Sequence, residues 1–383
     1  MTSTVRNEAV WADLLETRER AQLSPGIPDQ LARRPDVLVV GGGILGVATA
    51  VACRDAGAGS VLLIEAGRLG SGATGGAAGL LVPEAHQGVD PAALVDLGRA
   101  SLDRWRDLDA AVPGGLGLRD LDWFSLAPYP DGFLADPPAA AEWLDAAEVA
   151  RLVPGLTPAV PAVRVRHQGR VNPLRALSRL AARIPQVATG CPAIAVTVRG
   201  DRVLSVSTPA GSIAPGAAVF ATGLPPRLDG LDPGLPASTV KGHNIVTEPV
   251  PVTLPGMVMP LATQLEDGRL LTGGTMDAGD DTDLVRAEVA ERIRAGLAAA
   301  LPAVARARVT HRWCCRRPCH PDLLPVIDRV PGLSNAWLTS GHYRTGILMG
   351  PATGAALAGW ITSGRPPALA GPLTIGRRFA AQR

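Results

Sequence analysis

The sequence predicts an α/β fold in which a largely parallel sheet is assembled from segments far apart along the chain. Four short apolar runs have the character of strands buried on both faces of such a sheet: Asp36–Val40, Ser60–Ile64, Ala217–Ala221 and Asn335–Ser340. Hairpin signals lie between them, and the strongest is the dipeptide Asp267-Gly268. These observations predict a discontinuous domain with a second domain inserted between its parts.

The order of these signals predicts the domain boundaries. Residues 1–34 form an N-terminal extension, and the first domain takes residues 35–110, 166–243 and 310–383. The second domain takes residues 111–165 and 244–309. Asn172 followed by Pro173 is a good start for a helix, because asparagine caps the free amides and proline fits the first turn. Helices are predicted at Ala9–Ala21, Ile44–Ala56, 90–112, Asn172–Ile184, Asp283–Leu301 and Ala352–Ile361.

Composition excludes several classes of function. The 383 residues are 46% hydrophobic and 19% charged, which is enough for buried cores and unlike a disordered chain. A net charge of +2 gives no support for binding nucleic acid. No apolar run is long enough to span a bilayer, and the N-terminus lacks a secretory signal. The five cysteines are odd in number and not spaced as a disulfide framework, which predicts a cytoplasmic protein.

Gly41-Gly42-Gly43-Ile44-Leu45-Gly46 fits the pattern G-x-G-x-x-G between a strand and a helix. Gly41 allows a tight turn, Gly43 allows the backbone to approach a pyrophosphate, and Gly46 allows close packing of helix on strand. The amides at the helix N-terminus then face the phosphates. Glu65 ends the next strand, where its carboxylate can bind ribose hydroxyls and repel a 2′-phosphate. The pattern predicts dinucleotide binding in a Rossmann-type domain; the alternative is a generic glycine turn.

The stretch from Gly70 to Leu81 is too rich in glycine for a packed element. Small side chains and free backbone amides would allow a flat ring to lie against the chain. The alternative is a flexible surface loop. The switch into Ala77–Leu81 favours a buried segment that approaches a ligand closely.

From Pro35 onward the chain resembles the D-amino-acid oxidase superfamily of flavoenzymes, above all its glycine oxidase branch and next its sarcosine oxidase branch. The final matching segment is the most diagnostic, because GHYRTGIL followed by PATG is close to a signature of the glycine oxidase branch. The matching segments are VLVVGGGILGVATA, LLIEAG, GATGGAAGLL, GRVNPLRAL, AVFATG, VKGH, GRLLTGGTM, RRPCHPDLLPVIDRVPGL and GHYRTGILMGPATG.

The resemblance implies a discontinuous FAD-binding domain with an antiparallel substrate domain over the flavin. It implies that a substrate amine is oxidised by hydride transfer from its α-carbon to flavin N5, with O2 as acceptor and H2O2 as product. FAD is therefore the expected cofactor. The residues expected to bind it are Gly41, Gly43, Ile44, Leu45, Gly46, Glu65, Ala66, Ala73, Thr74, Ala78, Gly79, Leu80, Ala193, Thr222, Gly223, Gly341, His342, Tyr343, Arg344, Thr345, Gly346, Ile347 and Leu348.

The resemblance also assigns substrate-site residues. Arg317 matches the arginine that binds the substrate carboxylate, and a guanidinium suits that bidentate role; the alternative is a structural ion pair. Arg344 matches a second arginine near the substrate. Met276 matches a pocket methionine, or else belongs to the core. His342 is a candidate for proton transfer, although a histidine that supports its loop is the favoured interpretation.

Two positions depart from the glycine oxidase pattern. Met257 stands where that branch has a tyrosine near the substrate carboxylate, and the chain has only Tyr129 and Tyr343. The change predicts a substrate larger or more apolar than glycine. Cys315 falls where the sarcosine oxidase branch bonds covalently to the flavin; the alternative is a buried core thiol. Cys314, Cys315, Cys319 and His320 lack the spacing of a zinc site, so no metal is predicted.

Three functions remain open at this point. The leading one is an amine or amino-acid oxidase that uses O2. The second is a flavin-dependent dehydrogenase or imine-forming enzyme that passes electrons to a partner, because no lysine is expected near the flavin and the single lysine, Lys241, lies in the VKGH segment. The third is a flavin-binding structural subunit. The expected partner is a small amine or amino acid, without nucleic acid or a membrane, and a homo-oligomer is left open.

Overall fold

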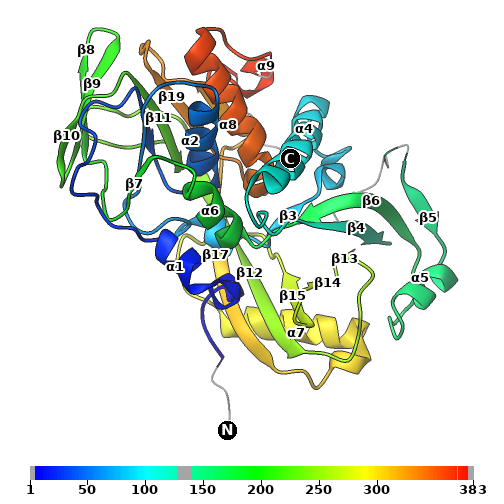
Figure 1. Cartoon of the computed structure of the whole chain (residues 1–383). Coiled ribbons are helices and arrows are strands. Elements are labelled where there is room, and N and C mark those ends of the chain that lie inside the picture. The colour runs from blue at the N-terminus through cyan, green and yellow to red at the C-terminus, as the bar shows by residue number, and fades with distance from the viewer. Residues whose placement is uncertain (1–4, 128–137, 139, 369, 378–383) are drawn as a thin grey trace.

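The computed structural model describes residues 5–127, 138, 140–368 and 370–377 (Figure 1). Its first sheet has six strands in the order β18-β19-β11-β1-β2-β7. All neighbours in this sheet are parallel except β18 and β19. The sheet confirms the predicted α/β fold assembled from distant segments. Its strands are β1 (Val37–Val40), β2 (Val61–Ile64), β7 (Gln186–Ala188), β11 (Ala217–Gly223), β18 (Val326–Arg329) and β19 (Ala336–Ser340).

Alternate residues of β1 enter two different cores, as the period of a strand requires. Val37 and Val39 pack in the core that contains helices α2 (Ile44–Asp55) and α8 (Gly346–Ser363). Leu38 and Val40 pack in a second core against a three-stranded sheet. The carboxyl ends of β1 and β2 lead directly into Gly41 and Glu65. The small sheet consists of β8 (Ala195–Arg199), β9 (Arg202–Thr208) and β10 (Gly211–Ile213).

Helix α8 begins at Gly346, earlier than the predicted start at Ala352, and it continues through Pro351. Proline cannot donate to the carbonyl four residues earlier. Trp105 of α4 (Ala92–Ala111) replaces that bond, because its indole Nε1 donates to the carbonyl oxygen of Ile347 at 3.1 Å. The hydroxyl of Ser101 donates to Leu348 and accepts from the amide of Ala352. Hydrogen bonds from α4 therefore stabilise α8 at Pro351, where the local sequence predicts that a helix is interrupted.

The second sheet has ten strands and is largely antiparallel. The turn at Asp267-Gly268 joins β14 and β15 as predicted, and Gly268 has a φ of +84°. Helices α5 (Ala146–Leu152), α6 (Pro173–Ala181) and α7 (Ala287–Ala300) complete the described core. The strands are β3 (Leu80–Leu81), β4 (Arg119–Leu126), β5 (Glu142–Leu144), β6 (Ala162–Arg170), β12 (Ser238–Pro249), β13 (Met257–Met259), β14 (Ala262–Gln264), β15 (Arg269–Gly273), β16 (Asp277–Ala278) and β17 (Val309–Cys319).

Sheet membership differs from the predicted boundaries in several places. Strands β12 and β17 pair with each other in the ten-stranded sheet. Residues 238–243 and 310–319, which we placed in the first domain, therefore lie in strands of the second sheet. An apolar alternation shows that a segment is a strand, but it does not show which sheet the strand joins.

The N-terminal extension packs on the body of the protein. The helix predicted at Ala9–Ala21 is two shorter pieces, η1 (Val10–Leu14) and α1 (Thr17–Gln22), and the Glu19 carboxylate accepts from the Glu16 amide at the start of the second. Trp11 is fully buried. Elements η2 (Pro83–His86), η3 (Pro302–Val304) and α9 (Ala370–Leu373) are short. Among the described residues no helix is long and apolar enough to cross a membrane.

Candidate functional site

A cavity of about 1130 Å³ lies between the two sheets. This volume is slightly above the usual range for ligand sites, about 300–1,000 Å³, so it can hold a large ligand. The glycine turn after β1, the glycine-rich segment and residues of both sheets contribute to its walls. The predicted residues that line it are Gly41, Gly43, Ile44, Leu45, Glu65, Ala66, Ala73, Thr74, Ala78, Gly79, Leu80, Ala193, Thr222, Gly223, Met276, Cys315, Arg317, His342, Tyr343, Arg344, Gly346, Ile347 and Leu348.

Four predicted site residues do not line the cavity. Gly46 packs behind the turn, as expected from its role, and Gly341 lies against the ring of His320. Thr345 directly precedes α8, and its hydroxyl donates to the His342 carbonyl at 2.8 Å and does not cap the helix. Met257 is fully buried beside Trp123, and the apolar wall predicted at that position comes from Met259, two residues further on.

The turn after β1 is built from backbone in very close approach. A Cβ on Gly41 would lie 2.4 Å from the Ala221 carbonyl oxygen, and φ is +117°. A Cβ on Gly46 would lie 1.9 Å from the Gly41 carbonyl oxygen. A Cβ on Gly43 would approach only the Thr74 hydroxyl, at 3.2 Å, so this glycine leaves the cavity side of the turn open. Close approach at Gly41 and Gly46 and an open side at Gly43 are the features that a dinucleotide-binding turn requires.

The Glu65 carboxylate is held in place by the backbone. One oxygen accepts from the Gly42 amide at 2.6 Å and the other accepts from the Gly67 amide at 2.8 Å. The residue follows β2 and lines the cavity. Each carboxylate oxygen can accept more than one hydrogen bond, so Glu65 can still bind a hydroxyl of a ligand.

The glycine-rich segment is packed and contains a short helix, α3 (Ala73–Gly76), which corrects the expectation that it is too glycine-rich for an element. Gly79 has a φ of +76°, and a Cβ there would lie 2.1 Å from the Val171 carbonyl oxygen. Two indoles fix the segment from outside: Trp11 donates to the Ala77 carbonyl at 2.8 Å, and Trp313 donates to the Gly76 carbonyl at 2.9 Å. The N-terminal extension therefore supports a wall of the cavity.

Arg317 projects from β17 into the cavity. Its Nη1 donates to the carbonyl oxygen of Thr275 at 2.9 Å. Gly242 on the paired strand makes room for it, because a Cβ there would lie 2.2 Å from Arg317 Nη2. Burial lowers the pKa of Arg317, but an arginine stays charged in proteins. Among the described residues no carboxylate forms an ion pair with this guanidinium, so it can bind an anionic ligand.

The segment after β19 brings three predicted residues to the cavity. Tyr343 has a φ of +45°, an uncommon conformation for a residue other than glycine, and its amide donates to the Pro318 carbonyl at 2.8 Å. The Arg344 guanidinium lies over the Tyr343 ring, 5.4 Å from its centre. The Tyr343 hydroxyl donates to Met276 Sδ at 3.3 Å. Helix α8 starts at Gly346, and its first residues, Gly346, Ile347 and Leu348, line the cavity.

His342 is buried and supports this segment. Its Nε2 lies 3.3 Å from the Thr353 hydroxyl of α8. Burial lowers the pKa of His342 to about 3, so its ring is neutral at physiological pH. A group with that pKa is a poor proton carrier near neutrality. The favoured interpretation, a histidine that supports its loop, agrees with this geometry.

The buried His342 ring predicts loss of stability in acid. The unfolded chain binds a proton near pH 6.5, whereas the folded chain binds it near pH 3, so stability is lost as pH falls below the unfolded pKa. From about pH 7.5 to about pH 5.5 the contribution of this residue is a loss of about 1.4 kcal/mol. Denaturant unfolding at both pH values should show a smaller pH dependence for His342→Asn. An unchanged pH dependence would contradict the assignment.

The sequence model of the FAD dependent oxidoreductase family (DAO) matches residues 36–360. The chain belongs to this family. The glycine oxidase of Pseudomonas putida is 27% identical over 351 residues, which are 86% of this chain and 95% of that protein. The glycine oxidase of Pseudomonas aeruginosa is 35% identical over 173 residues, which span 44% of this chain and 47% of that protein.

The fold of this FAD-dependent oxidoreductase is similar to that of glycine oxidase from Geobacillus kaustophilus. The TM-score is 0.78 at 24% sequence identity, over 91% of this chain and 100% of that one. The cavity fits FAD on three points of this structure: Gly43 leaves the turn open, the α2 N-terminus follows it, and Glu65 follows β2.

Sequence reasoning missed several residues of the cavity. Asn244 lines it from β12, and the alternation of that strand with Gly242 could have indicated this. Trp123 and His86 line it from β4 and η2, and Ile293 lines it from α7. No local signal marks these three, because their place depends on how the second sheet sits beside the first.

Proposed function

We propose that this protein oxidises the C–N bond of a small amino acid or related amine. Arg317 carries the proposal, since a half-buried guanidinium that lines the cavity and lacks a carboxylate partner among the described residues suits the carboxylate of an amino acid. FAD held in the cavity would supply the acceptor for the hydride of the substrate α-carbon, and O2 would be the final electron acceptor, with H2O2 as product. The protein binds and orients the substrate so that this carbon faces the cofactor.

The walls around Arg317 support a substrate larger or more apolar than glycine. Met276 lies beside it, and Met259 and Leu261 continue the cavity wall from the second sheet. An apolar side chain placed there gains about 0.8 kcal/mol for each buried methylene group. We therefore expect kcat/KM to rise from glycine to amino acids with larger apolar side chains.

A peroxide assay with the purified holoenzyme tests this proposal. The panel contains glycine, sarcosine, and the D- and L-forms of alanine, leucine and phenylalanine. We expect peroxide with at least one large apolar amino acid and a lower kcat/KM with glycine. Glycine as the best substrate by a wide margin would refute the apolar preference, and no turnover of any amine would refute the function.

A dehydrogenase that uses another electron acceptor is the second candidate, and the position of Lys241 favours it. The chain has no other lysine, and this side chain is fully buried away from the cavity in an ion pair with Asp280 at 3.1 Å. No lysine is therefore available beside the flavin. If an artificial dye supports turnover of the same amino acid much faster than O2 does, the dehydrogenase is the correct assignment.

Cys315 is expected to pack against the flavin without a covalent bond. Burial raises the pKa of its thiol to about 11, so the nucleophilic thiolate is scarce near neutral pH. The thiol Sγ donates to the Ala73 carbonyl at 3.4 Å. Acid precipitation should release all of the flavin from wild type and from Cys315→Ser. Yellow colour that stays with the precipitated wild-type protein, and is lost in Cys315→Ser, would establish a cysteinyl flavin.

A further inference from the structure

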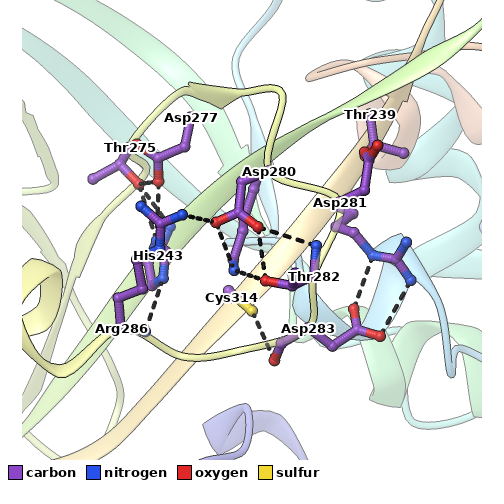
Figure 2. Close-up of polar contacts among 12 residues, drawn as sticks. Thr239, His243, Thr275, Asp277, Asp280, Asp281, Thr282, Asp283, Arg286 and Cys314 are labelled. Carbon is purple, nitrogen blue, oxygen red and sulfur yellow. Dashed lines mark hydrogen bonds and ion pairs between the residues drawn. The ribbon is translucent and has the colours of Figure 1, made fainter.

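The face of β12 and β17 that is turned away from the cavity carries a polar cluster that the proposed chemistry does not use. Gly242 pairs with Cys315, and the cavity lies on the side of this pair. Lys241 and His243 are the neighbours of Gly242, so their side chains leave the opposite face of the sheet. There they meet residues 275–286, which we call the anchored segment (Figure 2).

Lys241 holds the middle of the anchored segment. Its side chain is fully buried, and Nζ donates to Asp280 Oδ2 and to the Thr282 hydroxyl, both at 3.1 Å. Asp280 also accepts from the Arg286 guanidinium and from the Thr282 amide. Hydrogen bonds from Thr282 hold the pKa of Asp280 below its usual range, so this carboxylate stays ionised.

His243 contacts both ends of the anchored segment. The Arg286 amide donates to His243 Nε2 at 3.2 Å, which leaves the proton on Nδ1. His243 Nδ1 then donates to Asp277 Oδ2 at 3.1 Å. The Thr275 hydroxyl accepts from the His243 amide at 2.9 Å and donates to Asp277 Oδ2 at 3.1 Å. Burial lowers the pKa of His243, so the ring remains neutral and keeps this arrangement.

Thr275 and Met276, the first residues of the anchored segment, line the part of the cavity that contains Arg317, which we call the substrate chamber. The Thr275 carbonyl accepts from Arg317 Nη1 at 2.9 Å, and Met276 Sδ accepts from the Tyr343 hydroxyl at 3.3 Å. The contacts of Lys241 and His243 on the far side of the sheet thus fix the atoms that orient Arg317 on the near side.

We propose that Lys241 and His243 are positioning residues for substrate binding: they hold the anchored segment so that the Thr275 carbonyl aims Arg317 at the carboxylate of the substrate. The inference rests on the proposed function of Arg317. It accounts for the buried ion pair between Lys241 and Asp280. Stability alone does not account for this pair, because replacing a buried ion pair with apolar side chains is often neutral or stabilising. Precise placement is sufficient reason to keep it, since a shift of about 1 Å can cost roughly 100-fold in rate.

The first variant is Lys241→Met, which keeps the length of the side chain and removes its charge. Asp280 retains Arg286 and Thr282, so the change leaves no unpaired carboxylate. The second variant is Asp277→Ala, which removes the shared partner of His243 and Thr275 from a position that is 28% exposed. The control is Arg316→Gln, which breaks an exposed pair between Arg316 and Asp283 of the same segment.

The probe is anthranilate, an amino carboxylate that has no hydrogen on the carbon bearing nitrogen and so cannot be oxidised there. Its Kd is measured from the change in flavin absorbance of the holoenzyme. We expect the Kd to rise about 10- to 100-fold in Lys241→Met and Asp277→Ala, and to stay within about twofold in Arg316→Gln. The ratio of kcat/KM for an amino acid to kcat/KM for its decarboxylated amine should fall in the same two variants. A purely structural role would not change that ratio.

The outcomes separate this inference from the function on which it rests. Wild type that binds anthranilate, with variants that retain FAD and bind it equally well, would overturn the positioning role and leave the function intact. Wild type that neither binds anthranilate nor prefers amino acids over their decarboxylated amines would overturn the function of Arg317, and the positioning role with it. An equal loss of affinity in Arg316→Gln would also overturn the inference, because any disturbance of the segment would then suffice.

Discussion

Replacing Arg317 with Met is expected to lower kcat/KM for amino acids roughly 30- to 4,000-fold. This loss corresponds to about 2–5 kcal/mol less stabilisation of the transition state. The half-buried guanidinium lines the cavity, and its described hydrogen bond goes to a neutral carbonyl, that of Thr275. Methionine keeps the bulk of the side chain and removes the charge that would pair with the carboxylate. Steady-state kinetics with phenylalanine and with phenethylamine, which lacks the carboxylate, should show the loss for phenylalanine alone.

Two further variants sharpen this prediction. Arg316→Met alters the adjacent arginine, whose side chain is 40% exposed and pairs with the exposed Asp283, so kcat/KM should change by less than about twofold. Gly242→Ala keeps Arg317 but places a methyl group 2.2 Å from its Nη2, which forces the guanidinium to move. We expect an intermediate loss for phenylalanine. Equal losses for Arg316→Met and Arg317→Met would contradict the assignment of the carboxylate site.

Gly46→Ala is expected to abolish retention of FAD. The added Cβ would lie 1.9 Å from the Gly41 carbonyl oxygen, and backbone cannot move aside as a flexible side chain can. Relief of the contact would separate α2 from the glycine turn and misplace the amides that face the pyrophosphate. The flavin-to-protein ratio after purification, and after incubation with excess FAD, measures the effect.

Gly359→Ala is the matched control for this change. Gly359 lies in α8, and no atom lies within 4 Å of an added Cβ. Alanine in a helix interior is favoured over glycine by about 1 kcal/mol, so this variant should keep its flavin and unfold at the same or a higher temperature. Flavin retained at wild-type levels by Gly46→Ala would show that the turn does not bind the cofactor.

Local signals in the sequence predicted the nucleotide half of the site because its geometry is local. Gly41, Gly43 and Gly46 lie within one turn, and Glu65 follows one strand later, so spacing alone reports their arrangement. Four strands of the six-stranded sheet, β1, β2, β11 and β19, were predicted for a related reason, because they are continuous apolar runs; β7 and β18 were not predicted. The resemblance to flavoenzymes supplied Arg317, and the structure places it in the cavity.

Other features depend on contacts between distant segments, which local patterns do not report. The early start of α8 requires Trp105 and Ser101 to replace the hydrogen bonds that Pro351 interrupts. The support of the glycine-rich segment by Trp11 joins residues 66 positions apart. Lys241 was visible as the single lysine, but its role beneath the substrate chamber follows only from the register of β12 with β17.

Anaerobic mixing of the purified holoenzyme with amines tests the central claim most directly. The claim is that one cavity holds FAD on the Gly41 turn and an amino acid on Arg317. The account predicts that an apolar amino acid bleaches the flavin absorbance band, while its decarboxylated amine does so far more slowly. A protein that remains colourless after incubation with FAD, or a bound flavin that amines bleach equally well with and without a carboxylate, would contradict the account.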